Sequence, residues 1–120
     1  YLGADIKTGY PTFAYPIVRL DGALISQTPA ICQYALSKAG FQPKCIIKQA
    51  QSLQVALTAA DTWAEFYAQY KDDKEPTDEF IKTRIYKFFK TLEAQLKQNN
   101  DGKGFYFDDK PSVADVFVYD

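Results

Sequence analysis

The chain has 120 residues, of which 47% are hydrophobic and 24% are charged, and this balance excludes disordered and collagen-like chains. Its 14 Lys and Arg against 15 Asp and Glu give a formal net charge of -1, which argues against a nucleic-acid partner. It has no apolar stretch of about 18 residues and its first residues lack the order of a signal peptide, so we expect no membrane association and a cytoplasmic location. Histidine is absent, which excludes a Ser-His-Asp triad and His-ligated metals in this chain.

The first predicted element is a β-hairpin. Two β-prone runs, residues 17–20 and 23–26, flank the dipeptide Asp21-Gly22, which favours a type I′ turn. A helix follows, for which Thr28 is suited as the N-cap and Pro29 as the first helical residue, and it is expected to end before Gly40.

The next predicted elements are two long amphipathic helices. Residues 41–45 form a linker, and a helix of residues 46–70 follows, with its apolar stripe at Ile46, Ala50, Leu53, Leu57, Ala60, Ala64 and Tyr67. After a polar break, Thr77 caps a second helix, whose buried stripe is Ile81, Ile85, Phe88, Leu92 and Leu96. Asp78 with Lys82 and Glu93 with Lys97 are spaced as ion pairs on the exposed side of the second helix. We interpret both stripes as ordinary helix packing.

Residues 112–115, Ser-Val-Ala-Asp, resemble a capping box, so a further helix is predicted to open at Ser112. That helix has only about two turns, and the hairpin has no sheet to join. We therefore expect the sequence to be a piece of a longer protein. Cys32 and Cys45 have neither a disulfide-scaffold density nor a metal-ligand spacing, and are predicted to be buried or idle thiols.

The segment KTGYPTFAYPIVRLDGALISQTPAICQYAL resembles the second half of the thioredoxin-like domain of cytosolic glutathione transferases, nearest the sigma, mu, alpha and pi classes. The two long helices and the Ser-x-x-Asp box resemble the start of that family's helical domain. The resemblance implies an incomplete α/β thioredoxin-like part at residues 1–40, a linker at 41–45 and an incomplete all-α helical-bundle domain at 46–120.

Several residues match glutathione-binding positions of that family. Gln27 and Thr28 match the pair that holds the γ-glutamyl end of glutathione, although from the residues alone Thr28 could simply cap its helix. Pro16 matches a proline that is cis in thioredoxin-like folds, and Tyr15 before it would offer backbone groups to the cysteinyl part. Lys7 matches a lysine that meets the glycine carboxylate, against the alternative of a solvated surface lysine.

The resemblance also implies a contact across a dimer. Glu65 stands where many dimeric classes place an Asp that reaches the glutathione of the other subunit, and Asp61, one turn earlier, is the competing candidate. The residue that lowers the thiol pKa of glutathione follows the family's first strand, which this sequence does not contain. The catalytic residue is therefore unknown.

The expected function of the intact protein is a glutathione transferase that conjugates the glutathione thiolate to a small apolar electrophile. Glutathione is a co-substrate, no metal is expected, and the partner is a second copy in a homodimer with a role in detoxification. The alternative is a catalytically silent glutathione-transferase-like binding or structural subunit. A helical interaction domain with no affinity for glutathione is a third class.

Overall fold

The structure is a computed structural model that describes residues 12–13, 15–70 and 74–119. The predicted glutathione contact Lys7 lies outside these residues. The chain divides into two compact units, Tyr1–Gly40 and Phe41–Asp120, and each unit is described by itself.

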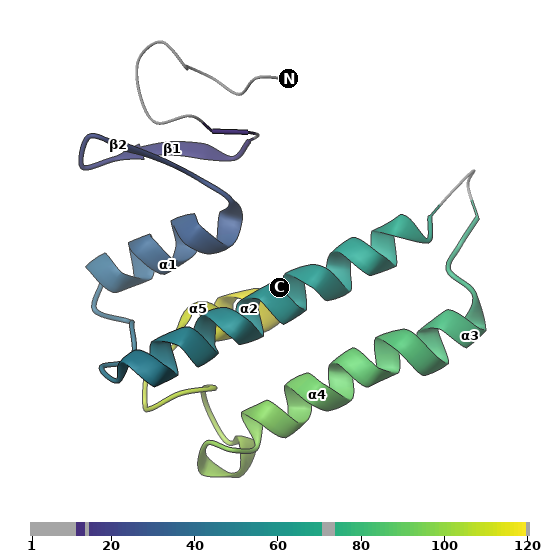
Figure 1. The fold of residues 1–120 in the computed structure, drawn as a ribbon. Coiled ribbons are helices and arrows are strands. Elements are labelled where there is room, and N and C mark those ends of the chain that lie inside the picture. The colour runs from purple at the N-terminus through teal and green to yellow at the C-terminus, as the bar shows by residue number, and fades with distance from the viewer. Residues whose placement is uncertain (1–11, 14, 71–73, 120) are drawn as a thin grey trace. The chain divides into compact units, whose positions relative to one another are not determined.

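The first unit contains the predicted β-hairpin (Figure 1). Strands β1 (Ile17–Leu20) and β2 (Ala23–Ser26) pair antiparallel, with Ile17 opposite Ser26 and Leu20 opposite Ala23. Asp21 and Gly22 have φ values of 49° and 84°, and positive φ at both loop residues is what a two-residue type I′ loop requires. The hairpin prediction is therefore confirmed.

Helix α1 (Thr28–Lys38) follows the hairpin and contacts β2. The predicted cap is wrong by one residue, because Gln27 flanks the helix and Thr28 is already helical. The chain turns into the helix at Gln27, whose φ is 73°, and Thr28 is the first residue of the helix instead of its N-cap. The predicted end is confirmed, since the helix stops before Gly40, which has a φ of 77°.

A polar cluster ties the hairpin turn to α1. The carboxylate of Asp21 accepts a hydrogen bond from the Tyr34 hydroxyl and pairs with the Lys38 ammonium at 2.7 Å. The hydrogen bond from Lys38 is the main reason why the pKa of Asp21 lies below its usual value. This cluster links the C-terminal half of α1 to the hairpin turn.

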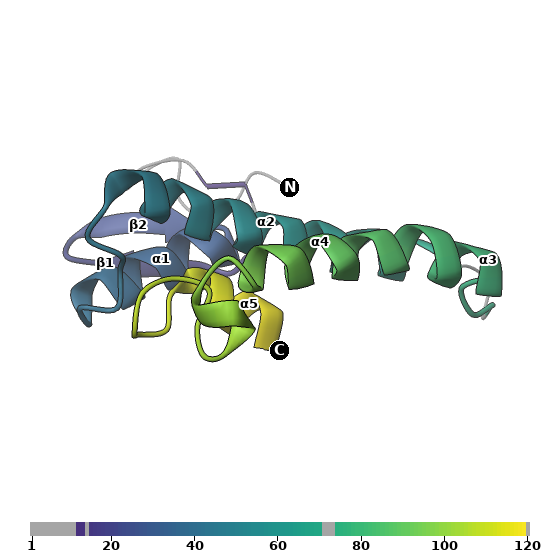
Figure 2. The ribbon, with the colours of Figure 1, turned by 90° about the horizontal axis from the view of Figure 1, so that it is seen from below.

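The second unit consists of long helices. Helix α2 spans Ile46–Ala68, and α3 (Asp78–Phe80), the π-helical turn η1 (Ile81–Ile85) and α4 (Tyr86–Leu96) follow one another without a break. A 3-10 turn η2 (Asn100–Gly102) then leads by a loop to α5 (Val113–Tyr119). Figures 1 and 2 show α4 running beside α2, and α2 contacts both α4 and α5.

The predicted capping and charge pairs of the second long helix are confirmed. The Thr77 side chain accepts a hydrogen bond from the Phe80 N–H at 3.2 Å. The ion pairs Asp78–Lys82 and Glu93–Lys97 have N–O distances of 2.8 and 2.7 Å. The π-helical turn was not expected, because its extra residue per turn leaves no mark on hydrophobic spacing over so few residues.

The predicted apolar stripe is partly correct for the second long helix and wrong for α2. In the second helix, Ile85 and Leu92 are buried, but Ile81 is 41% exposed. In α2 the predicted stripe is wrong, since Ile46, Leu57 and Tyr67 are 78%, 45% and 63% exposed. The buried positions of α2 are mostly small residues: Ser52, Val55, Ala56, Ala59 and Thr62. Small side chains let α5 approach α2 closely, and hydrophobicity alone does not reveal that preference.

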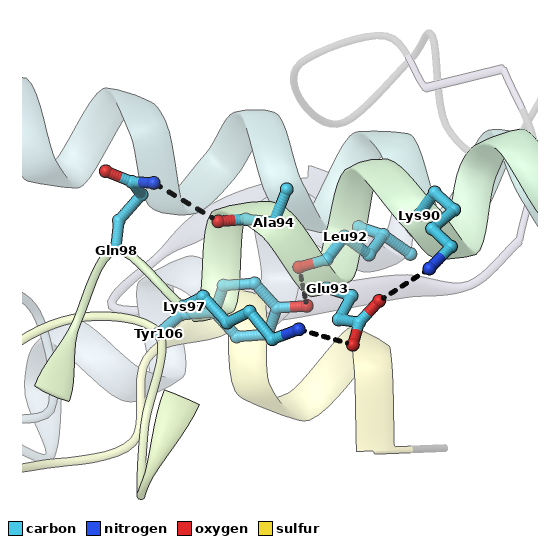
Figure 3. Close-up of polar contacts among 7 residues, drawn as sticks. All are labelled: Lys90, Leu92, Glu93, Ala94, Lys97, Gln98 and Tyr106. Atoms are coloured by element: carbon cyan, nitrogen blue, oxygen red, sulfur yellow. Dashed lines mark hydrogen bonds and ion pairs between the residues drawn. The ribbon is translucent and has the colours of Figure 1, made fainter. Parts of the chain in front are cut away.

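The core of the second unit is centred on Val55, Leu92, Tyr106 and Ala114. The Tyr106 hydroxyl donates to the backbone carbonyl of Leu92 at 3.0 Å, which holds the loop after α4 against that helix (Figure 3). Burial, with a smaller contribution from the Asp115 carboxylate, raises the pKa of Tyr106 to about 12. Tyr106 therefore stays protonated and keeps this bond well above neutral pH.

Half of the predicted capping box at Ser112 is present, because the Asp115 side chain reaches back to Ser112, while the Ser112 hydroxyl donates to that carboxylate and does not accept from the Asp115 N–H. The Asp115 carboxylate accepts from the Ser112 N–H at 2.7 Å and from the Ser112 hydroxyl at 2.8 Å. Its other oxygen accepts from the Tyr106 N–H at 2.8 Å, a contact that the local sequence did not indicate. The same side chain thus starts α5 and fixes the loop that precedes it.

Candidate functional site

The candidate glutathione site is built around the start of α1. Gln27 and Thr28 are both exposed, and no side chain caps this helix. Pro29 has no N–H, and the first hydrogen bond of the helix runs from the Ile31 N–H to the Gln27 carbonyl at 3.1 Å. The N–H groups of Thr28 and Ala30 therefore have no hydrogen-bond partner among the described residues. They form, with the Thr28 hydroxyl, a set of donors that suits a carboxylate.

The backbone at Gln27 is unusual for a residue that carries a side chain. Its φ of 73° and ψ of 116° lie in a region that costs energy for any residue except glycine. Backbone strain of this kind gathers at ligand sites, where it directs a side chain or a donor group. No local signal in the sequence predicts this conformation, because glutamine is not a typical turn residue.

The second part of the candidate site is the entry to β1. The Tyr15–Pro16 peptide bond is cis, which is the conformation that the family resemblance implied. The Tyr15 side chain is 77% exposed, and the strand order places Pro16 directly before β1. Tyr15, Pro16, Gln27 and Thr28 all belong to the first unit.

The two acidic candidates lie on α2 in the second unit, and their surroundings differ. Glu65 forms a two-pronged pair with Arg84 of η1, in which Nε and Nη2 each lie 2.6 Å from one carboxylate oxygen. The Arg84 guanidinium holds the pKa of Glu65 below its usual value, and it also lies 4.8 Å from the centre of the Phe88 ring. Asp61 is exposed and has no ion pair with any described residue.

Both cysteines are free thiols, as predicted. Cys45 is exposed and directly precedes α2. The backbone N–H groups of Lys48 and Ile47 lower the pKa of its thiol, because they stabilise the thiolate. Cys32, in the other unit, is half-buried.

An apolar hollow of about 350 Å³ lies among α2, α4 and α5. Its walls include Trp63 and Phe66 of α2, Phe89 of α4 and Phe117 of α5. The hydroxyl of Thr62, which also lines it, is committed to the Thr58 carbonyl at 2.8 Å. The hollow can therefore hold an apolar group, and Tyr119 brings the one titratable side chain among its lining residues.

Two further classes of site are absent from the described part of the chain. None of its helices combines the length and the apolar composition needed to cross a bilayer. Among the same residues, no three His, Cys, Asp or Glu side chains gather in a way that could hold a metal ion.

The chain was compared with protein families, curated sequences and solved structures. A family model described as "Glutathione S-transferase, C-terminal domain" matches residues 59–120. No curated protein sequence matches the chain at a significant level.

Two solved structures are similar to the chain. A glutathione S-transferase from Caenorhabditis elegans has a TM-score of 0.69 and 24% identity, and the match covers 88% of this chain and 54% of that one. A Nu-class GST from Haemonchus contortus has a TM-score of 0.62 and 24% identity, with 91% of this chain and 56% of that one covered. The likeness confirms the predicted fold class, a partial thioredoxin-like part followed by an all-α part, and the chain spans just over half the length of both structures.

Proposed function

Because this chain belongs to the glutathione S-transferase family, whose C-terminal domain model matches more than half of it, we propose that the intact protein is a glutathione transferase. In this function it joins the glutathione thiolate to a small apolar electrophile. Glutathione is the co-substrate, and no metal takes part. We further propose that the protein works in the cytoplasm as a homodimer with a detoxifying role, and that residues 1–40 and 46–120 are its two partial domains, joined by the linker 41–45.

The observation that carries the proposal is the uncapped start of α1. The N–H groups of Thr28 and Ala30 have no partner among the described residues, and the Thr28 hydroxyl is exposed beside them. The γ-glutamyl end of glutathione carries a carboxylate and an ammonium group. Its carboxylate would bind these donors and gain from the positive end of the helix dipole, while the side-chain amide oxygen of Gln27 would accept from the ammonium.

The entry to β1 supports the same ligand. The Tyr15 N–H and carbonyl, just before β1, are the backbone groups that we propose to pair with the cysteinyl part of glutathione, in the manner of a short added strand. Lys7 completes the proposed site as the cation for the glycine carboxylate. None of these residues activates the thiol, and the catalytic residue is unknown.

The first test measures glutathione affinity by titration calorimetry on the intact protein. Gln27→Ala is expected to weaken binding tenfold or more, because hydrogen bonds to a charged ligand are typically worth about 1.5–3 kcal/mol. Gln33→Ala, in the middle of the same helix, is the matched control and should leave the affinity unchanged. An unchanged dissociation constant in Gln27→Ala, with helicity intact by circular dichroism, would remove this site from the proposal.

Activity is a separate question from binding. The intact protein should conjugate glutathione to an aromatic chloride substrate if it is a transferase. Retention on glutathione-agarose without conjugation would identify the silent binding subunit instead. Failure to be retained at all would point to the helical interaction domain.

We also propose Asp61, in preference to Glu65, as the carboxylate that meets the glutathione ammonium of the other subunit. Both oxygens of Glu65 are held by Arg84 at 2.6 Å, whereas Asp61 is exposed one turn earlier on α2. An ammonium ion would have to displace a two-pronged guanidinium to reach Glu65, and such pairs are the stronger kind.

This assignment predicts opposite results for two neutral replacements. Asp61→Asn should raise the glutathione dissociation constant several-fold, and Glu65→Gln should leave it within twofold. Calorimetry on both variants decides between them. A larger loss in Glu65→Gln, with the helices intact, would reverse the assignment.

A further inference from the structure

A polar pocket of about 230 Å³ lies within the second unit, between α2, the end of α4 and the loop that follows it. Its volume is below the roughly 300–1,000 Å³ of clefts that hold drug-sized ligands, so it suits a smaller molecule. Side-chain amides from both helices line it: Gln51 and Gln54 of α2, Gln95 of α4, and Gln98 just after α4. Figure 3 shows Gln98 and Tyr106 at this end of α4.

The glutamine side-chain amides of this pocket have few hydrogen-bond partners among the described residues. The side-chain amides of Gln51 and Gln54 make no hydrogen bond to any other described residue, and the Gln98 amide makes one long bond of 3.5 Å to the Ala94 carbonyl. The Oε1 atom of Gln95 is buried and has no partner among the described atoms. A buried carbonyl without a donor is costly. The pocket therefore calls for a molecule that donates a hydrogen bond to Gln95.

Three other polar groups of the lining, the Lys48 ammonium, the Asn99 amide and the Tyr106 hydroxyl, already have partners. The Lys48 ammonium pairs with the Asp108 carboxylate. The Asn99 amide donates to the carbonyls of Phe105 and Asp108 at 2.8 and 2.9 Å. Because the cation is neutralised, the pocket offers no net charge to a ligand, and an anion would gain little there.

The remaining lining is apolar and partly aromatic, with Val55, Tyr106 and Phe107. Aromatic rings suit flat ligands that stack or pack edge to face on them. A glutamine amide presents a donor and an acceptor side by side, which matches the adjacent donor and acceptor on the edge of a purine ring. Together these features select a flat, neutral ring that carries both hydrogen-bonding groups.

We propose that this pocket is a binding site for a small neutral heterocycle with adjacent N–H donor and ring-nitrogen or carbonyl acceptor groups, of the nucleobase type. Gln95 accepts the ligand's N–H, and Gln51, Gln54 and Gln98 supply further amide contacts. The site is made only of residues of the second unit. It is therefore independent of the proposed glutathione function.

The test uses adenine, adenosine and AMP as probes on the intact protein, by saturation-transfer NMR and calorimetry. Adenine or adenosine should bind saturably, and Gln95→Leu, which keeps the side-chain bulk and removes the amide, should weaken binding at least fivefold. Gln54→Leu, at an exposed position of α2, should also weaken binding and covers the case in which Gln95→Leu fails to fold. Gln69→Leu, beyond the end of α2, is the matched control and should change nothing.

Three results would overturn the proposal. The first is no saturable binding of adenine or adenosine at millimolar concentration, with only an ordered water at Gln95 in a crystal soaked with adenine. The second is equal affinity in Gln95→Leu, Gln54→Leu and the unmodified protein. The third is binding of AMP at least tenfold tighter than adenosine, since that would mean a charged ligand. Glutathione affinity should be unchanged in Gln95→Leu, which separates failure of this site from failure of the glutathione site.

Discussion

Asp115→Ala is expected to lower the free energy of unfolding by about 3 kcal/mol, because the carboxylate accepts three hydrogen bonds that nothing else replaces. Two come from the N–H and hydroxyl of Ser112 at 2.7 and 2.8 Å. The third comes from the Tyr106 N–H at 2.8 Å. Removal of the acceptor leaves these donors unpaired in a part-buried setting, where hydrogen bonds to a charged group are worth about 1.5–3 kcal/mol each and do not add fully. Urea denaturation measures the loss.

Asp109→Ala is the matched control, since Asp109 is exposed in the loop before α5 and its carboxylate accepts no hydrogen bond from a described residue. It should change the free energy of unfolding by less than about 0.5 kcal/mol. Glutathione affinity should stay the same in both variants once the fraction folded is taken into account. A loss below about 1 kcal/mol in Asp115→Ala would mean that the box and the loop contact contribute little to the fold.

Local signals predicted much of the fold because their causes are local. The Asp21-Gly22 turn, the Thr77 cap and the Ser112–Asp115 box each depend on a few consecutive residues. Such motifs satisfy backbone groups or set φ within one turn, so nothing distant is needed to recognise them. The contact from Asp115 to the Tyr106 N–H joins residues of a loop and a helix, and no spacing rule anticipates it.

At the start of α1, which belongs to the candidate site, local sequence motifs predict the wrong N-cap residue. A Thr-Pro pair predicts a cap at Thr28, but the chain turns at Gln27 with a φ of 73°. The conformation at Gln27 leaves two helix N–H groups without a side-chain cap, which is a poor outcome for the helix alone. The backbone of Gln27 thus departs from its local preference at the place where we propose a ligand site. Residues at functional sites often have conformations that lower the stability of the fold.

The pairing of Glu65 with Arg84 could not be predicted from the sequence either. The two residues come from different helices, and the π-helical turn shifts the register of every side chain after it. Helical spacing relates Asp61 to Glu65 on one face, but cannot say which of them a distant arginine will hold. The choice between the two candidates therefore depends on the side-chain pair that joins α2 to η1.

The buried face of α2 is the part of the fold for which the sequence-based prediction and the structure disagree most. A pair of substitutions tests which face is buried. Ala56 is fully buried, one turn after Ser52, whose hydroxyl accepts from the Ala114 N–H of α5 at 3.3 Å. Leu57, the next residue, is 45% exposed. Ala56→Leu is expected to lower the free energy of unfolding by about 3 kcal/mol, because three added carbon atoms would push α5 away from a close-packed contact.

Leu57→Ala is the matched replacement and should cost less than about 1 kcal/mol, the usual effect at a surface position. A stripe based on hydrophobicity alone predicts the reverse order, since Leu→Ala in a core costs about 2–5 kcal/mol. Thermal and urea melts of the two variants separate the alternatives. If Leu57→Ala destabilised the protein more than Ala56→Leu did, the buried face of α2 would be the one that hydrophobic spacing indicates, and the contact between α2 and α5 would have to be discarded.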